Sequence, residues 1–418
     1  MPRIKRGLLM MVGVVLLLFV VLVLVVPRMV STEMLTTRLI QAVERATGAQ
    51  VTLQEARLSW WGRWHVTLRD GSLVGTGAAL TAATGTPNEL ESFTIAIEEL
   101  SLTPALLPLL RKKLEIQTIE MTGPRLAVVW GRGRAEVTGY RLRLTHLNLG
   151  LDPSVPVRRS DAPGELIPAD LSFHFSTAAD TLVLERVPYT RFEAEGVFAS
   201  KVLEVTSLAA RRATGKLEGI LAVDYAADPW GRLDFEATVE DVPGDELLVP
   251  WLPDIAQRLE CDLDASVVGG LDLRDAATRS RTLDIAGSLT GGEGILHAAD
   301  WLTEVRPYLG DRQDLLDIRF RKLDHQFRVV QGRYLLQDLA FGGRDTDWRA
   351  QGWVELEGRL AIGIDVKLPP GFTPDLGNFS FLAATLRDPE GRINLPLQLS
   401  GPSNRPTVGV DLGRLRTP

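Results

Sequence analysis

The chain has 418 residues, of which 45% are hydrophobic and 24% charged, and this is the composition of a folded protein rather than of a disordered one. Residues 1–28 hold four of the 46 basic residues and none of the 53 acidic ones, so the rest of the chain carries a net charge of −11. Because the binding of phosphate backbones requires an excess of Lys and Arg, this balance argues against nucleic acid as a partner.

The first element is a run of 19 residues, 8–26, that contains no charged or polar side chain. At 1.5 Å per residue, a helix of this length spans the roughly 30 Å hydrocarbon core of a bilayer. A cleaved signal peptide has a shorter apolar run and a small-residue cleavage site, which is not found here. Arg3, Lys5 and Arg6 precede the run and only Arg28 follows it directly, which predicts a cytoplasmic N-terminus. We therefore expect a single-pass membrane helix.

The segment after the predicted membrane helix favours a second helix over residues 31–48, which Gly48 ends. Three tryptophans follow, namely Trp60, Trp61 and Trp64. Together with Arg28 they form a candidate membrane-interface group, but packing in a protein core is an equally good interpretation of the tryptophans. The small and polar run at 75–90 predicts a loop.

Beyond residue 90, apolar residues recur at every second position, which predicts half-buried antiparallel strands. A single apolar face can be buried as the core of a sandwich or can line a groove that holds acyl chains. Phenylalanines spread along successive strands, and the scarcity of helices before residue 250, favour the groove. The candidate lining residues are Phe93, Ile95, Phe173, Phe175, Leu182, Leu184, Phe192, Phe198, Leu221, Val223, Leu233 and Phe235.

Two nine-residue segments, WLPDIAQRL at 251–259 and WLTEVRPYL at 301–309, share a helical spacing of apolar residues. They resemble each other at an offset of 50 residues, which indicates either a duplicated helix-and-strand unit or a chance similarity. We expect both to be helical inserts between strands.

Signals for catalysis are missing from the sequence. The one cysteine, Cys261, cannot form an intramolecular disulfide and is interpreted as a buried thiol. The five histidines are at least 28 residues apart, so no short metal-binding pair exists. The run Gly287–Gly291 places Leu289 where a nucleophile elbow needs serine. We therefore expect a protein that is not an enzyme and that uses neither a metal nor another cofactor.

Several longer segments resemble the AsmA-like proteins of Gram-negative envelopes, a family that includes TamB-type and YhdP-type relatives. Near the N-terminus the resemblance lies in VTLQEARLSWWGRWHVTLRDGSL at 51–73 and PLLRKKLEIQTIEMTGPRLAVV at 108–129. Towards the C-terminus it lies in FRKLDHQFRVVQGRYLLQDLAFGG at 320–343, GWVELEGRLAIGIDV at 352–366 and NLPLQLSGPSNRPTV at 394–408.

The resemblance implies a mainly β fold, an elongated antiparallel sheet that forms a taco-like or tube-like groove. It also implies a periplasmic body anchored in the inner membrane that handles lipids, phospholipids first, between the inner and outer membranes. Envelope proteins are expected partners at sheet edges or at the C-terminal end. The predicted division is a membrane segment at 1–28, an N-terminal module at 29–140, a middle segment at 141–245 and a C-terminal module at 246–418. The alternative function is an anchored scaffold that supports outer-membrane protein assembly and carries no lipid.

Overall fold

The computed structural model describes most of the chain beyond residue 49. The described residues are 37, 40, 41, 43–45, 47–59, 65–84, 90–104, 115–130, 133–148, 170–184, 186–226, 231–248, 256–273, 279–297, 317–343, 346–355, 358–374, 386–402, 406–411.

The described residues form a mainly β protein, as predicted. Eighteen strands take part in the large antiparallel sheet pairing, three short strands form a second sheet, and the helices with defined bounds have four to eight residues. The chain divides into two compact units, residues 1–201 and 202–418, which are described separately. This division is based on contacts, and the four-segment division drawn from the sequence stays a prediction.

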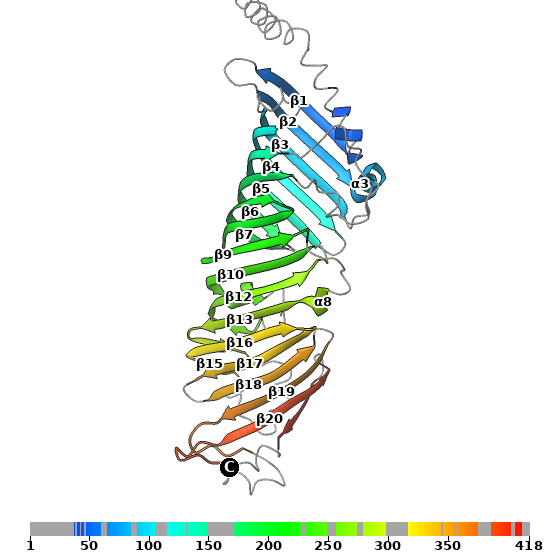
Figure 1. Ribbon diagram of the computed structural model, residues 1–418. Helices are drawn as coiled ribbons and strands as arrows, with labels where there is room; N and C mark the ends of the chain where they lie inside the picture. The colour runs from blue at the N-terminus through cyan, green and yellow to red at the C-terminus, as the bar shows by residue number, and fades with distance from the viewer. Residues whose placement is uncertain are drawn as a thin grey trace, which may run out of the picture. The chain divides into compact units, whose positions relative to one another are not determined.

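In the first unit, seven strands lie side by side in chain order, and each pairs with the strand before it (Figure 1). They are β1 (Gln50–Ser59), β2 (His65–Thr76), β3 (Leu90–Pro104), β4 (Glu115–Trp130), β5 (Gly133–Asn148), β6 (Ser172–Leu184) and β7 (Val187–Ala199).

Within the second unit, neighbouring strands of the main sheet are also antiparallel. Its main strands are β8 (Val202–Arg212), β9 (Gly215–Asp224), β10 (Arg232–Pro243), β12 (Asp262–Asp272), β13 (Asp284–Gly291), β16 (Lys322–Val330), β17 (Arg333–Gly342), β18 (Asp347–Glu355), β19 (Arg359–Lys367), β20 (Asn394–Pro402) and β21 (Thr407–Val410). A separate three-stranded sheet consists of β11 (Leu259–Glu260), β14 (Gly294–Leu296) and β15 (Ile318–Phe320), and the short helices are α6 (Gly244–Leu248) and α8 (Arg279–Thr282).

The prediction of a loop at 75–90 is wrong at residues 75–84 and at Leu90, where strand β3 begins. Strand β2 extends to Thr76, and helix α3 covers Gly77–Thr84. The small residues that indicated a loop include several alanines, which are the best helix formers. The Thr76 hydroxyl caps the helix by accepting a hydrogen bond of 3.2 Å from the Ala79 N–H.

The helix predicted at 31–48 is present at the described positions 37, 40, 41, 43–45 and 47. It ends as expected at Gly48, whose φ is +64° and whose N–H donates to the Glu44 carbonyl at 2.8 Å. Residues 8–26, Arg28 and the three tryptophans lie outside the described residues. Among the residues that are described, no helix is long and apolar enough to cross a membrane.

The two predicted helical inserts lie largely outside the described residues, which omit 251–255 and 301–309. The first insert ends earlier than predicted, because Leu259 begins strand β11. The likeness between the two segments stays a prediction.

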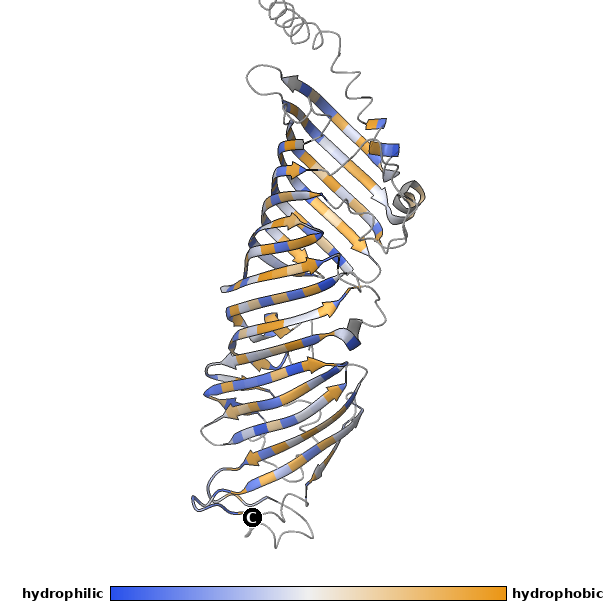
Figure 2. Cartoon of the chain, in the orientation of Figure 1, coloured by the Kyte–Doolittle hydropathy of each residue, from blue (hydrophilic) through white to orange (hydrophobic). Residues whose placement is uncertain are grey.

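Along the strands, hydrophobic and hydrophilic residues alternate (Figure 2). The polar face carries cross-strand ion pairs, such as Glu120 with Arg143 at 3.3 Å and Asp284 with Arg328 at 2.9 Å. All four of these side chains are about half exposed, and ion pairs at the surface add little to stability. The stability of the sheet therefore comes mainly from its apolar face.

The alternation changes phase in the middle of several strands. In β7, the apolar face is formed by Val187 and Tyr189 and then by Phe192 and the following even positions, while Arg191 and the residue before it are both exposed. Arg191 adopts a left-handed φ of 52°, and Asp70 in β2 and Gly139 in β5 also have positive φ values. A residue with a positive φ turns the strand locally, so the apolar residues before and after it point to the same face.

In β10, a bulge produces the same effect. The register with β12 shifts between Val239 and Val242, and Asp241 has a φ of 56°. The Asp264 carboxylate of β12 accepts a hydrogen bond of 2.9 Å from the Asp241 N–H, which satisfies a backbone group that the bulge takes out of the ladder. The contact between Asp241 and Asp264 is thus part of the structure of the bulge.

Candidate functional site: the apolar sheet faces

The apolar face of the first unit begins with a row of cross-strand neighbours. Ile95 of β3, Leu126 of β4, Val137 of β5, Leu182 of β6 and Tyr189 of β7 lie opposite one another in succession. Cross-strand partners share a face of the sheet. The register therefore brings the predicted residues Ile95 and Leu182 onto one face although 86 residues separate them in the sequence.

Phe93 lies against the sheet next to this row. Its registered partner is Gly75 of β2, and a Cβ on Gly75 would stand 2.5 Å from Cζ of the Phe93 ring. The ring therefore occupies the space that a side chain at Gly75 would fill. Leu184, at the end of β6, is 40% exposed.

A second group lies at the other end of β6 and β7. The Phe173 and Phe198 rings stack with their centroids 5.2 Å apart and their planes at 11°. Phe175 is opposite Gly196, and Phe192 is opposite Ala179. Because β7 changes phase at Arg191, Phe192 and Phe198 share a face with Val187, which is also buried.

The first unit leaves most of these large side chains only half-buried. This applies to Phe93, Ile95, Phe173, Phe175, Leu182 and Phe192, whereas Phe198 is 5% exposed. The cluster of fifteen buried hydrophobic residues that the structure describes lies in the second unit and contains none of these side chains. The apolar face of the first unit is thus continuous across strands and incompletely covered.

The four remaining predicted residues lie in the second unit. Leu221 is opposite Phe235, and Val223 is opposite Leu233, on β9 and β10. Val223 is buried, and the other three are half-buried. The structure therefore places the twelve predicted residues on two apolar faces, eight in the first unit and four in the second, and their contact with lipid stays a prediction.

Another part of the second unit's apolar face is closed. Fifteen buried residues form one hydrophobic core there, and they include Leu323 of β16, Trp348 of β18, Val366 of β19 and Leu397 of β20. The alternation of apolar residues at 360–368 and 395–399 predicts β19 and β20. It gives no signal that this face, unlike the first, is covered by other parts of the chain.

A polar pair lies on this second face, formed by the buried His325 and the half-buried Tyr334. The His325 side chain is close enough to hydrogen-bond through Nε2 to the Tyr334 hydroxyl, and both rings lie near that of Phe327. Burial lowers the pKa of His325 and raises the pKa of Tyr334, so both are neutral near pH 7. In the sequence, this pair is indicated by the position of His325, which alternates in phase with the apolar residues Leu323 and Phe327 of β16.

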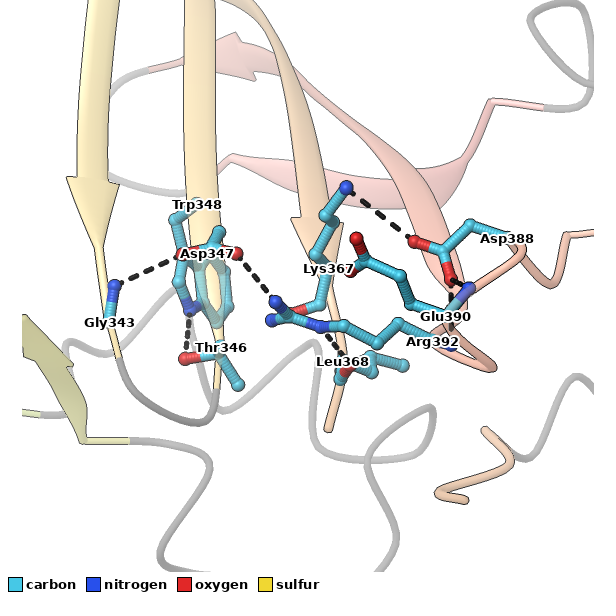
Figure 3. A network of polar contacts seen from close by, with 9 residues as sticks. All are labelled: Gly343, Thr346, Asp347, Trp348, Lys367, Leu368, Asp388, Glu390 and Arg392. Carbon is cyan, nitrogen blue, oxygen red and sulfur yellow. Dashed lines mark hydrogen bonds and ion pairs between the residues drawn. The ribbon is translucent and has the colours of Figure 1, made fainter. Parts of the chain in front are cut away.

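A network of charged groups borders the closed core (Figure 3). The Arg392 guanidinium contacts Asp347 Oδ2 at 2.9 Å and donates to the carbonyls of Leu368 at 3.1 Å and Lys367 at 3.3 Å. The Asp388 carboxylate accepts hydrogen bonds from the Glu390 and Arg392 N–H groups, and the bond from Arg392 is the main reason that the pKa of Asp388 is lowered. These contacts fix the turn that precedes β20.

The structure also describes Cys261, which is interpreted from the sequence as a buried thiol. Cys261 is half-buried rather than fully buried, and burial together with the charge of Asp262 raises the pKa of its thiol to about 11. The thiol is therefore protonated at neutral pH and is a poor nucleophile. Over the described ranges, no three His, Cys, Asp or Glu side chains gather in a way that could hold a metal ion.

These features define a class of protein, an antiparallel β protein with one apolar face per strand, partly covered in one unit and closed in part of the other. The model of the AsmA family matches residues 1–139, so the chain is AsmA-like over its N-terminal third. This confirms the resemblance seen at 51–73 and 108–129, and it suggests an envelope-associated function. The resemblance at 320–408 lies beyond the match and stays a prediction. No curated protein and no solved structure gives a significant match to the chain.

Proposed function

We propose that this chain is an inner-membrane-anchored periplasmic protein that binds phospholipids and passes them between the inner and outer membranes. The observation that carries the proposal is the incompletely covered apolar face of the first unit, on a chain whose first 139 residues match the AsmA family. In this proposal the protein is not an enzyme, and the acyl chains lie on the apolar face while the headgroups stay in water.

The energetics require a long apolar surface. Burial of a 16-carbon acyl chain contributes about 0.8 kcal/mol per methylene, or on the order of 10 kcal/mol in total. A face that runs through Ile95, Leu126, Val137 and Leu182 without a charged residue in the row can offset much of the cost of leaving a bilayer. An interrupted face would not do so.

The predicted membrane helix would place the apolar face of the first unit beside the inner membrane. Residues 8–26 would hold the first strands near the inner membrane, and Trp60, Trp61 and Trp64 would lie at its surface, where amphipathic rings are favoured. Lipid would then enter near β1 and β2.

Photocrosslinking in cells tests the proposal. Benzoylphenylalanine replaces Phe175 on the apolar face or, as a matched control, the exposed Ser176 on the polar face of the same strand. The cells grow with radioactive phosphate, and the full-length protein is irradiated and purified under denaturing conditions. We expect labelled phospholipid to be attached from position 175 and not from position 176.

The outcomes separate the two candidate functions. Equal label at both positions, or none at position 175, would count against lipid binding on this face. Crosslinks to envelope proteins without lipid would instead support the anchored scaffold.

A further inference from the structure

The three-stranded sheet of β11, β14 and β15 has a one-sided distribution of side chains. Leu259, Leu296, Ile318 and Phe320 are 2–9% exposed and belong to the hydrophobic core of the second unit. The intervening residues Ile295 and Arg319 pair on the other face, and Arg319 is exposed. The small sheet therefore directs a compact apolar surface toward the main sheet.

The residues that meet this surface are of the same kind as those on the first unit's apolar face. The core includes Leu263 of β12, Leu323 of β16 and Leu395 of β20, which are 0–2% exposed. Phe320 packs beside Phe341 of β17 with ring centroids 5.2 Å apart. The chain thus fills with its own side chains a sheet face that in the first unit is only half covered.

We propose that this three-stranded sheet is a built-in plug, which takes the place of acyl chains on the apolar face between β16 and β20. The inference rests on the proposed lipid binding by the first unit and defines where that binding stops. Bound lipid contacts the first unit and is excluded from the closed core. A lipid that reached this region would first have to displace the plug.

The construction of the plug fits this role. Its strands have two, three and three residues, too few to be stable alone in water, so the sheet depends on its apolar contacts with the main sheet. On its outer face, His297 contacts Glu260 at 2.9 Å and Asp317 at 3.6 Å, and these solvent-exposed pairs add little. Loss of the inward side chains should therefore release the plug, whereas changes on its outer face should not.

The test extends the photocrosslinking experiment to Leu339 of β17, a partly buried residue that packs against the core. In the full-length chain with the plug intact, we expect no lipid label from benzoylphenylalanine at position 339. With Ile318→Ser and Phe320→Ser together, label should appear there. The matched control is Arg319→Ser on the exposed face of the same strand, which should leave position 339 unlabelled.

Position 175 serves as the internal reference in every chain. Label at 175 that persists in the double variant shows that the first unit is still folded and still binds lipid. Label at 339 with the plug intact, or label at 339 in neither chain, would overturn the plug. Absence of label at 175 in the unaltered chain would instead overturn the proposed function.

Discussion

The apolar face is partly open in the first unit and closed around β20 in the second. This difference predicts that Phe175→Ala and Leu397→Ala lower the stability by different amounts. Leu397 is 1% exposed and lies opposite Ile364, which is also buried. Leu397→Ala removes three carbon atoms, about 2.4 kcal/mol at 0.8 kcal/mol each, and leaves a cavity that raises the total to about 3–4 kcal/mol. Phe175 is half-buried opposite Gly196, so its truncation leaves no closed cavity and should cost about 1–2 kcal/mol.

Hydrogen exchange measured by mass spectrometry on the full chain is the appropriate assay. The two compact units need not unfold together, so the free energy of opening has to be measured separately for peptides of β20 and of β6. Ser176→Ala, at an exposed position beside Phe175, is the control and should change stability by less than about 0.5 kcal/mol.

Equal losses of opening free energy for the two substitutions would refute this reasoning. If Phe175→Ala lowers the opening free energy of β6 as much as Leu397→Ala lowers that of β20, the first face is a closed core. The lipid proposal would then lose its structural basis.

Three further predictions concern polar groups. The Tyr140 hydroxyl donates to the Ala96 carbonyl at 2.8 Å, so Tyr140→Phe removes this hydrogen bond and should cost about 0.5–1.5 kcal/mol, measured as lost exchange protection in β3 and β4. Burial lowers the pKa of His325 below its ordinary value of 6.5, so stability should be complete above that pH and fall as the pH drops through it; thermal melts between pH 8 and 5 should show this slope, and His325→Phe should abolish it. Arg392→Met removes the ion pair with Asp347, which keeps its hydrogen bond from the Gly343 N–H, and should cost about 1–3 kcal/mol of protection in β19 and β20, whereas Arg392→Lys should recover only part of it because an ammonium cannot replace the guanidinium fork.

The sequence predicted the strands well because a period of two is a local property. It missed the change of phase at Arg191, since two consecutive polar residues within a run of apolar ones resemble a turn, and the left-handed geometry of Arg191 leaves no signature in residue type. It also misassigned α3, where alanine and glycine mixed with threonine are compatible with either a loop or a helix.

The sequence could not predict which apolar face would be covered. Phe173 and Phe175 alternate in the same way as Leu395 and Leu397, yet the first two are half-buried and the last two are almost fully buried. The difference depends on segments distant in the sequence, such as Phe320 of β15, that pack over one face and not over the other. Burial of this kind is decided by tertiary contacts, which no local pattern encodes.

The order of strand pairing has a consequence for how the protein is made. Within each unit, every strand of the main sheet pairs with the main-sheet strand that precedes it in the chain, so nearly all its backbone hydrogen bonds join sequence neighbours. Such low contact order allows each new hairpin to dock as the chain emerges, without waiting for the C-terminus. The plug is an exception, since β11 and β15 are 58 residues apart and β14 must pair with both. Closure of the second unit's core is therefore expected to be a late event in folding.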